Sequence, residues 1–290
     1  MIKFGDLYLE IRQTLRRAGV EAYAMEAREL VRCCAGMTRE KFTASQALYM
    51  DAATEAKCRA ALERRLADEP LAYILGEWDF YGLTFQVEPT VLIPRPDTEL
   101  AAEKAIEYMT AVGEGGRLLD LCTGTGCIGI TVAVNVPGCR AVLADISEDA
   151  LAVTKKNAAL NSVSGRTLPV KADAMSDPPE YIGKFHLITC NPPYITEAEY
   201  PGLDDSVRLY EPALALLGGR DGLDFYRSVC EKWKKALRPG GRIIFEIGET
   251  QAEEVSAILD TNGFIIKDVL KDNAGHDRVV IGELQKDEEI

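Results

Sequence analysis

The sequence predicts an α/β protein in which a small helical bundle precedes a mostly parallel β-sheet. Between residues 4 and 72, apolar residues such as Leu7, Ile11 and Leu15 recur at helical spacing, without strand-like alternation. After Leu100 the pattern changes to short apolar runs that alternate with helical segments. This alternation is typical of a parallel sheet that is covered by helices on both faces.

The bounds and types of the individual elements are predicted from glycine and turn residues, which interrupt helices and strands, and from residue type. Gly19, Gly36 and residues 43–45 divide the N-terminal part into four or five helices. Aromatic and β-branched residues around Gly82, in EWDFYGLTFQVE, predict a β-hairpin. We expect seven strands after it, at residues 117–122, 140–146, 167–172, 185–190, 242–247, 264–270 and 278–284.

The last two predicted strands are joined only by DNAGH, which is too short for a crossover helix. The seventh strand should therefore run antiparallel to the sixth. The pattern divides the chain into a helical domain at 1–75, a hairpin linker at 76–92 and a sheet domain at 93–290. The final residues, KDEEI, are expected to form a solvated tail.

The composition and charge of the chain argue against several classes of protein. Subtracting 46 acidic from 33 basic residues gives a net charge of −13 over 290 residues, which argues against a protein that binds nucleic acid mainly through basic contacts to phosphate. No run of about 18 apolar residues and no signal-peptide core occurs, so we expect a cytoplasmic protein without membrane attachment. The 8 cysteines form no C-x-x-C pair and only 2 histidines accompany them, which predicts reduced thiols and no metal site.

A glycine-rich turn follows the first predicted strand. Gly124-x-Gly126-x-x-Gly129 opens a helix, and Asp145 ends the second strand about 20 residues later. Glycines let a backbone approach a ligand closely, and a carboxylate at that strand end can accept hydrogen bonds from ribose hydroxyls. This pattern suits NAD or S-adenosylmethionine equally. A simple strand-to-helix turn is the alternative, and we favour ligand binding.

The strongest motif is Asn191-Pro192-Pro193-Tyr194, directly after an apolar strand. Two prolines fix the backbone and lack N–H donors, so the Asn191 side chain and nearby carbonyls can point into a pocket. Two such acceptors would orient a planar amide or amino nitrogen toward a methyl donor. Tyr194 offers an aromatic face for stacking and for cation–π attraction to a sulfonium. The alternative is a rigid turn, which we consider less favourable in this context.

Two other segments are ambiguous. Asp173, just after the third strand, could accept a hydrogen bond from an adenine amino group or could close a turn. In IPRPDTEL (93–100), two prolines stiffen a loop, and helix capping is as plausible as a binding role for the following residues.

Taken together, these motifs resemble the HemK-type protein-(glutamine-N5) methyltransferases, which modify peptide-chain release factors. The resemblance runs from about residue 70 to the C-terminus and is carried by EPLAYILGEWDFYGLTFQV, VLIPRPDTEL, LLDLCTGTGCIGI, Asp145, CNPPYI and YEPALALLGGRDGLDFYR. It implies a seven-stranded, Rossmann-like class I methyltransferase domain at 93–290, with residues 1–75 recognising the substrate. It also implies S-adenosylmethionine as cofactor and S-adenosylhomocysteine as product.

The resemblance assigns site residues as well. It implies that the cofactor is bound by Cys122, Thr123, Gly124, Thr125, Gly126, Asp145, Asp173, Ala174 and Asn191. Catalysis would fall to Asn191, Pro192 and Tyr194, with Pro193 beside them and with Arg95 and Glu99 at the mouth of the substrate site.

Two positions depart from the family pattern. Cys122 stands where the family usually has a glycine, and Ala174 follows Asp173 where an aromatic residue is common. A Cβ at the glycine turn restricts the backbone, and alanine removes an adenine-stacking face. We therefore expect weaker cofactor binding than is usual in the family.

Parts of this pattern fit four different functions. The leading one is methylation of a glutamine amide in a release factor by a monomer that binds neither nucleic acid stably nor membranes. The same motif suits N6-adenine methylation of nucleic acid, against which the net charge of −13 stands. An NAD-dependent oxidoreductase would need hydride-handling residues that the sequence does not show. A non-catalytic adaptor is disfavoured because the segment from Asn191 to Tyr194 is intact.

Overall fold

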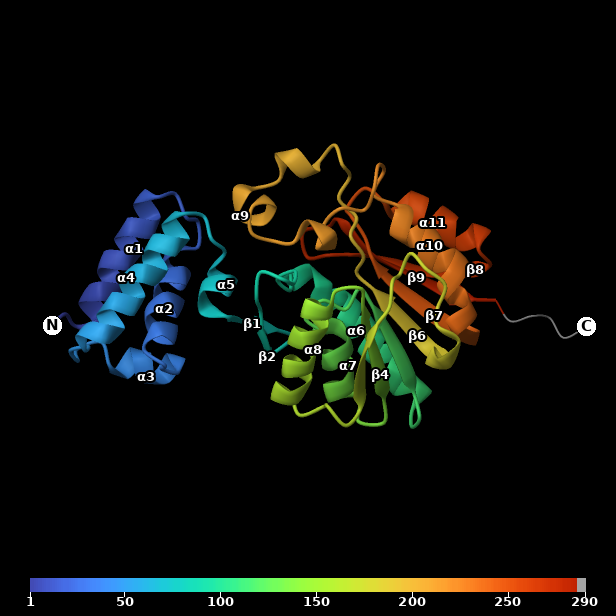
Figure 1. Ribbon diagram of the computed structural model, residues 1–290, viewed down its shortest axis with the longest axis horizontal. Helices are drawn as coiled ribbons and strands as arrows, with labels where there is room; N and C mark the ends of the chain where they lie inside the picture. Colours follow the sequence, from blue (N-terminus) through green and yellow to red (C-terminus); the bar gives the residue numbers. More distant parts are fainter. Residues whose placement is uncertain (286–290) are drawn as a thin grey trace, which may run out of the picture. The chain divides into compact units, whose positions relative to one another are not determined.

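The computed structural model describes residues 1–285 and divides into two compact units (Figure 1). The first contains Met1–Glu77 together with Asp205–Tyr210, and the second contains Trp78–Asp204 and the chain from Glu211 onward. The predicted KDEEI tail lies outside the described residues. Within residues 1–285, no helix has the length and apolar character that a membrane span requires.

The first unit is a bundle of short helices. Its five N-terminal helices are α1 (Phe4–Arg17), α2 (Tyr23–Cys34), α3 (Arg39–Ala44), α4 (Ala52–Leu66) and α5 (Leu71–Leu75). The predicted apolar spacing is confirmed, because Leu7, Ile11 and Leu15 of α1 are fully buried. Asp51 caps α4 by accepting a hydrogen bond from the Thr54 N–H at 2.8 Å, as expected for an aspartate at an N-cap.

A short segment from much later in the sequence also belongs to this unit. It contains α9 (Asp205–Arg208), and the Tyr210 hydroxyl donates a hydrogen bond to the carbonyl of Ala67. No periodic pattern in the sequence indicated this grouping, because it depends on a contact between residues far apart in the chain.

The second unit begins with the predicted hairpin, which the structure confirms. Strands β1 (Glu77–Phe80) and β2 (Leu83–Gln86) are joined by Tyr81 and Gly82, whose φ angles are 51° and 73°. Positive φ at both positions is the geometry of a two-residue turn that matches the twist of the strands. The rings of Phe80 and Phe85, one from each strand, meet edge to face with their centroids 6.0 Å apart.

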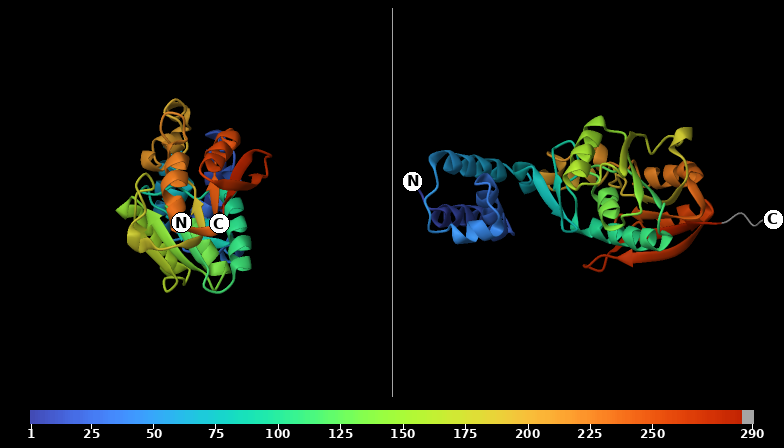
Figure 2. Two further views of the ribbon diagram at one scale, coloured as in Figure 1. Left: turned by 90° about the vertical axis from the view of Figure 1, so that its right-hand side faces the viewer. Right: turned by 90° about the horizontal axis from the view of Figure 1, so that it is seen from below.

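The main sheet has seven strands in the order β5-β4-β3-β6-β7-β9-β8. All neighbouring pairs are parallel up to β7, whereas β9 is antiparallel to both β7 and β8, so the predicted reversal is confirmed. Figure 2 shows β8 and β9, in red, at one margin of the sheet. The strands are β3 (Arg117–Leu121), β4 (Arg140–Asp145), β5 (Thr167–Lys171), β6 (Phe185–Cys190), β7 (Leu237–Glu246), β8 (Phe264–Lys271) and β9 (Asp277–Leu284).

Helices cover both faces of this sheet. Adjacent residues point to opposite faces: Leu118 belongs to the apolar cluster under the first group of helices, and Leu119 to the cluster under the second. The first group is α6 (Glu99–Val112), α7 (Cys127–Asn135) and α8 (Glu148–Leu160). The second group is α10 (Asp224–Lys232) and α11 (Ala252–Thr261), on the opposite side in Figure 1.

Strand β7 starts earlier than the sequence predicts. Its first pairing is Leu237 with Phe185, and the regular ladder resumes only at Arg242 with Leu187, after a register irregularity. The predicted strand began at residue 242, after the intervening Pro-Gly-Gly, and proline and glycine normally interrupt strands. Here the irregularity accommodates them inside the strand.

Candidate active site

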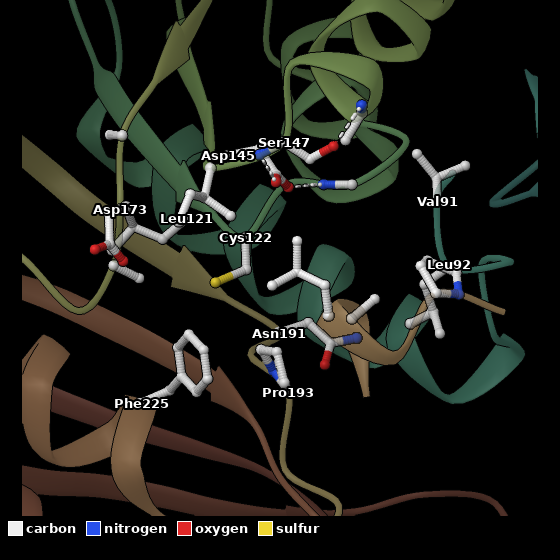
Figure 3. A pocket seen from close by; sticks show the side chains of 18 of the residues that line it. Val91, Leu92, Leu121, Cys122, Asp145, Ser147, Asp173, Asn191, Pro193 and Phe225 are labelled. Atoms are coloured by element: carbon white, nitrogen blue, oxygen red, sulfur yellow. Dashed lines mark hydrogen bonds between the residues drawn. The ribbon is translucent and has the colours of Figure 1, made fainter. Parts of the chain in front are cut away.

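A cavity of about 320 Å³ opens at the carboxyl ends of four neighbouring strands (Figure 3). Its walls include Cys122 after β3, Asp145 at the end of β4, Asp173 after β5 and Asn191 after β6. The strand order reverses between β3 and β6, and the crevice at such a reversal is where open α/β sheets bind ligands. The sheet therefore gathers residues that lie far apart in the sequence into one pocket.

The glycine turn and Asp145 form one wall of the cavity. The Asp145 carboxylate accepts hydrogen bonds from the Gly124 N–H at 2.9 Å and from the Ser147 N–H at 3.0 Å, as drawn in Figure 3. Burial raises the pKa of Asp145. Gly124 has φ of 55°, and no atom lies within 4 Å of the position that a Cβ would take. The backbone is thus open at the point where a ligand could approach it.

Cys122 and Ala174, which depart from the family pattern, both line the cavity. Cys122 has φ of 55°, a left-handed conformation that few residues with a Cβ adopt, so the expected restriction at this turn is present. Ala174 offers only a methyl group, but Phe225 at the start of α10 lines the same cavity. Figure 3 shows the Phe225 ring on the same side of the cavity as Asp173.

Asp173 closes a turn and also lies on the cavity wall. Its carboxylate accepts hydrogen bonds from the Met175 N–H and from the Ser176 hydroxyl, both at 2.8 Å, and so closes a turn. The residue also lines the cavity. A carboxylate has more acceptor sites than these two bonds occupy, so further hydrogen bonds to a ligand are possible.

The Asn-Pro-Pro-Tyr segment leaves the end of β6. Asn191 and Pro193 line the cavity, whereas Pro192 and Tyr194 are not among its lining residues. Tyr194 packs against the apolar cluster under α10 and α11, and burial raises its pKa to about 12. The Nδ2 atom of Asn191 donates a long hydrogen bond, 3.5 Å, to the Thr98 hydroxyl.

A small hollow of about 40 Å³ adjoins the cavity and shares Cys122, Gly124 and Asn191 with it. Thr123, Thr125 and Arg95 complete its predicted lining residues. The guanidinium of Arg95 donates a hydrogen bond to Glu211, a buried residue that the sequence analysis did not single out. Glu211 also accepts a hydrogen bond from the Ile93 N–H at 3.2 Å. The ion pair therefore ties the loop before α6 to residue 211.

Two predicted residues lie elsewhere. Glu99 lines a separate hollow of about 150 Å³ with Lys271 and Asp272, and its carboxylate accepts a hydrogen bond from the Tyr81 N–H at 2.7 Å. Gly126 lines neither the cavity nor the small hollow. It has φ of 84° at the start of α7, and a Cβ there would lie only 2.6 Å from Ile130. Its glycine is thus explained by packing.

Several cavity residues were not assigned to the site by the sequence analysis. They are Thr90, Val91 and Leu92, the apolar residues Pro212, Leu214 and Ala215, and Phe225. Val91 and Leu92 lie in the family-like stretch at 91–100 and the last four in the one at 210–227, and these stretches were the sequence signal that could have indicated them. Behind Asn191, the buried Glu246 was also missed.

Comparison with known proteins identifies the family. A family model described as the PrmC N-terminal domain matches residues 6–76, and one described as the methyltransferase small domain matches residues 99–204. The release factor glutamine methyltransferase of Clostridium acetobutylicum is 44% identical over 212 residues, which cover 73% of this chain and 74% of that protein. This chain belongs to the release factor glutamine methyltransferase family.

Other relatives extend the similarity along nearly the whole chain. The protein of the same name from Clostridium botulinum is 35% identical over 277 residues, which cover 95% of this chain and 97% of that protein. A crystal structure of a methyltransferase from Pyrococcus furiosus is similar in fold, with a TM-score of 0.52 and 16% identity, and the match covers 80% of this chain and 99% of that one. The chain is therefore a methyltransferase with the class I fold that its sequence predicts.

Proposed function

We propose that this chain transfers a methyl group from S-adenosylmethionine to the side-chain amide nitrogen, N5, of a glutamine in a peptide-chain release factor, with S-adenosylhomocysteine as the product. Membership of the family supports this proposal. The observation that carries it is the position of Asn191, which lines the same cavity as the glycine turn and Asp145. An amide-orienting side chain and a cofactor-type turn are thus neighbours.

The cavity suits the proposed cofactor. Its volume of about 320 Å³ is in the range of small-molecule sites, and carboxylates lie on a mostly apolar wall. Each Asp145 oxygen accepts one backbone hydrogen bond and keeps acceptor capacity for ribose hydroxyls. Asp173 would accept from the adenine amino group, and Phe225 would supply the aromatic face that Ala174 lacks. When bound, S-adenosylmethionine supplies a methyl group on a positively charged sulfur.

The proposed roles of the substrate-side residues follow from their chemistry. The Oδ1 atom of Asn191 and the carbonyl of Pro192 would accept hydrogen bonds from the two amide hydrogens of the glutamine. This orients the nitrogen lone pair, and orientation can lower a barrier by several kcal/mol without a strong base. Tyr194 does not line the cavity, so stacking on the planar amide would require its ring to turn toward the substrate, while Pro193 and Arg95 would lie at the edges of the site. Glu99, which lies in the separate hollow, would have only an indirect role.

We further propose that the helical unit recognises the release factor. A single glutamine side chain buries far less surface than the roughly 800 Å² per partner of a specific protein interface, so further contacts are needed. The free thiols of all eight cysteines are compatible with the reducing cytoplasm as the site of action. That the protein acts there as a monomer remains a prediction.

The experiment incubates the protein with methyl-labelled S-adenosylmethionine and, separately, release factors and total nucleic acid. We expect label on a glutamine of the release factor, located by mass spectrometry, and none on nucleic acid. Asn191→Ala should lower turnover about 10²–10³-fold, by analogy with the loss of one oriented transition-state hydrogen bond. Label on adenine instead of glutamine would contradict the proposal and favour the N6-adenine alternative.

A further inference from the structure

Glu246 lies directly behind Asn191. It is the last residue of β7. The residue before it, Phe245, pairs with Cys190 at the end of the parallel strand β6. Glu246 and Asn191, which follow these two residues, are therefore also adjacent. Glu246 is only 2% exposed and is not among the residues that line the cavity. Burying an acidic side chain costs free energy unless it is paired or hydrogen-bonded. We therefore expect Glu246 to have a function among the side chains around it.

The Glu246 carboxyl faces two polar side chains. Both side chains, Thr98 and Asn191, act to lower its pKa as hydrogen-bonding groups would, and its Oε2 atom is buried without a hydrogen-bond partner among the described residues. The Thr98 hydroxyl has one proton, and when that proton is donated to Glu246 its oxygen can only accept from Asn191. The 3.5 Å hydrogen bond from Asn191 Nδ2 to the Thr98 oxygen has this direction.

The charge of Arg278 lowers the pKa of Glu246, but it does not outweigh burial. Arg278 on β9 is engaged elsewhere, because its guanidinium donates to Asp272 at 3.1 Å and to the carbonyl of Ile247 at 3.1 Å. Asp97 adds a like charge nearby, and burial has the largest effect, so the pKa of Glu246 is raised to about 7. The other titratable groups that sense its charge are Cys127 on α7, Tyr194 after β6 and Tyr226 on α10.

The side-chain amide of an asparagine has nearly the same shape when it is rotated by 180°, but the two orientations exchange donor and acceptor. The proposed reaction requires Oδ1 of Asn191 to face the substrate amide. A neighbour that only accepts hydrogen bonds selects the orientation with Nδ2 toward itself. An ionised carboxylate has this property, and so does a hydroxyl whose proton is already donated.

We propose that Glu246 is a positioning residue that, directly and through the Thr98 hydroxyl, holds the NH₂ group of Asn191 toward the sheet and its carbonyl oxygen toward the substrate glutamine. This inference rests on the proposed function. When Glu246 is protonated on its free oxygen, it can donate to Oδ1 of Asn191 and stabilise the reversed orientation. Turnover should therefore fall as the pH is lowered through about 7.

The test compares kcat, cofactor affinity and pH profile for Glu246→Gln, Glu246→Met and the parent protein on a release factor. Glu246→Met removes the acceptor and should lower kcat about 10–100-fold, as for other residues that orient a ligand-bearing side chain, with cofactor affinity unchanged within about twofold. Glu246→Gln should show a smaller loss of kcat and no inflection near pH 7. Glu283→Gln, on partly exposed β9, is the matched control and should retain the parental kcat and profile.

A second pair of variants covers the possibility that Glu246 variants fold poorly. Thr98→Val removes the hydroxyl and should lower kcat, whereas Thr98→Ser keeps it and should restore most of the parental rate. Folding of Glu246→Gln is itself predictable: because the folded-state pKa is raised, the ionised group destabilises the folded protein above pH 7, so the variant should melt no lower than the parent at pH 8.

The outcomes separate this inference from the proposed function. A parent protein that labels glutamine, together with Glu246→Met and Thr98→Val variants at parental kcat, overturns the role of Glu246 and leaves the proposed function standing. A parent protein that labels no glutamine overturns the proposed function and, with it, this inference. A kcat loss confined to the Glu246 and Thr98→Val variants, with the pH inflection absent from Glu246→Gln, supports both.

Discussion

The Asp145 carboxylate hydrogen-bonds the backbone of the adjacent turns and still lies where it could bind a ligand. It holds the N–H groups of Gly124 and Ser147, and its position on the cavity wall suits ribose hydroxyls. Asp145→Asn keeps the size but removes the charge, so we expect S-adenosylmethionine binding to weaken by about 1–3 kcal/mol, the range for charge-assisted hydrogen bonds.

Calorimetry on the parent and Asp145→Asn would check this expectation, with the exposed Asp149→Asn of α8 as the matched control. Unchanged affinity in Asp145→Asn would remove Asp145 from the cofactor site. Titration with NAD belongs in the same experiment, because tight binding of NAD in place of S-adenosylmethionine would favour an oxidoreductase.

Cys122 offers a second test at the scale of one residue. Its left-handed backbone, with φ of 55°, costs roughly 1–2 kcal/mol in a residue with a Cβ, partly offset by the entropy that a glycine loses on folding. Cys122→Gly should therefore change the free energy of unfolding by no more than about 1 kcal/mol. Because it also removes a side chain from the cavity wall, it should tighten cofactor binding about threefold, roughly 0.7 kcal/mol.

Ser162 provides the control for this substitution, since its φ is 60° and it lies outside the cavity. Ser162→Gly should change stability similarly, as measured by urea unfolding, without any effect on cofactor affinity. If Cys122→Gly bound the cofactor more weakly than the parent, the thiol would be a favourable cofactor contact and the expected cost of this departure from the family pattern would be wrong.

At the scale of elements, Asn157 of α8 joins the hairpin to the glycine turn. Its fully buried amide accepts from the Gln86 N–H at 2.6 Å and donates to the carbonyls of Gln86 at 3.0 Å and Thr125 at 2.9 Å. Asn157→Ala leaves these backbone groups without partners in a buried place, so we expect a loss of about 2–4 kcal/mol in stability. Cofactor affinity should fall too, because Thr125 belongs to the turn.

Asn161, one helical turn later, donates to the carbonyl of Thr84 at 3.1 Å and is less buried, so Asn161→Ala should cost only about 1 kcal/mol. Thermal unfolding of both variants measures the difference. Equal destabilisation would mean that α8 packing, and not the Asn157 network, fixes the hairpin.

The strands could be predicted because the apolar character of their own residues shows that they are buried. Four apolar runs, in β3, β4, β6 and the second half of β7, are buried on both faces and mark the parallel core, and β6 coincides with the predicted 185–190. The Pro-Gly-Gly inside β7 could not be anticipated, because it depends on an irregular pairing with β6. The order of the strands in the sheet also cannot be predicted from local sequence patterns. The short DNAGH connection was nevertheless sufficient to predict the reversal of β9.

Whether a site residue could be predicted depends in the same way on whether a local sequence pattern marks it. Asn191 and Asp145 stand in motifs at strand ends, so they could be assigned to a pocket before the fold was known. Glu211 holds Arg95 of the small hollow and Phe225 lines the cavity, and both are brought there by a loop and a helix whose course no local sequence pattern predicts. Glu246 did leave a signal: it is an acidic residue that ends an apolar strand beside the strand of Asn191, and comparing neighbouring strand ends would have indicated it.

At the scale of the whole molecule, the two units have different chemistry. The polar groups of the cavity and of the small hollow all belong to the sheet unit, and the helical unit contributes none of their lining residues. The segment Asp205–Tyr210 groups with the helices, yet the next residue, Glu211, holds Arg95 in the small hollow. The segment assigned to the helical unit is thus followed directly along the chain by a residue of the sheet unit that contacts the small hollow.

This separation yields the last prediction. A protein that lacks residues 1–76 keeps both apolar clusters of the sheet unit, so it should fold and bind S-adenosylmethionine with an affinity within about threefold of the parent. It should also retain slow methylation of a short glutamine peptide, because the proposed amide site is complete. Turnover of the intact release factor should fall to that of the peptide, since the protein-recognition surface is gone.

Circular dichroism and calorimetry establish that the truncated protein is folded and binds the cofactor, and labelling then compares the two substrates. Asp205–Tyr210 loses its partners in this protein, so Tyr210→Phe in the full chain is the control: it removes only the hydrogen bond to Ala67. If the truncated protein methylates the intact release factor at the parental rate, the sheet unit itself recognises the partner, and the helical bundle must be assigned another role.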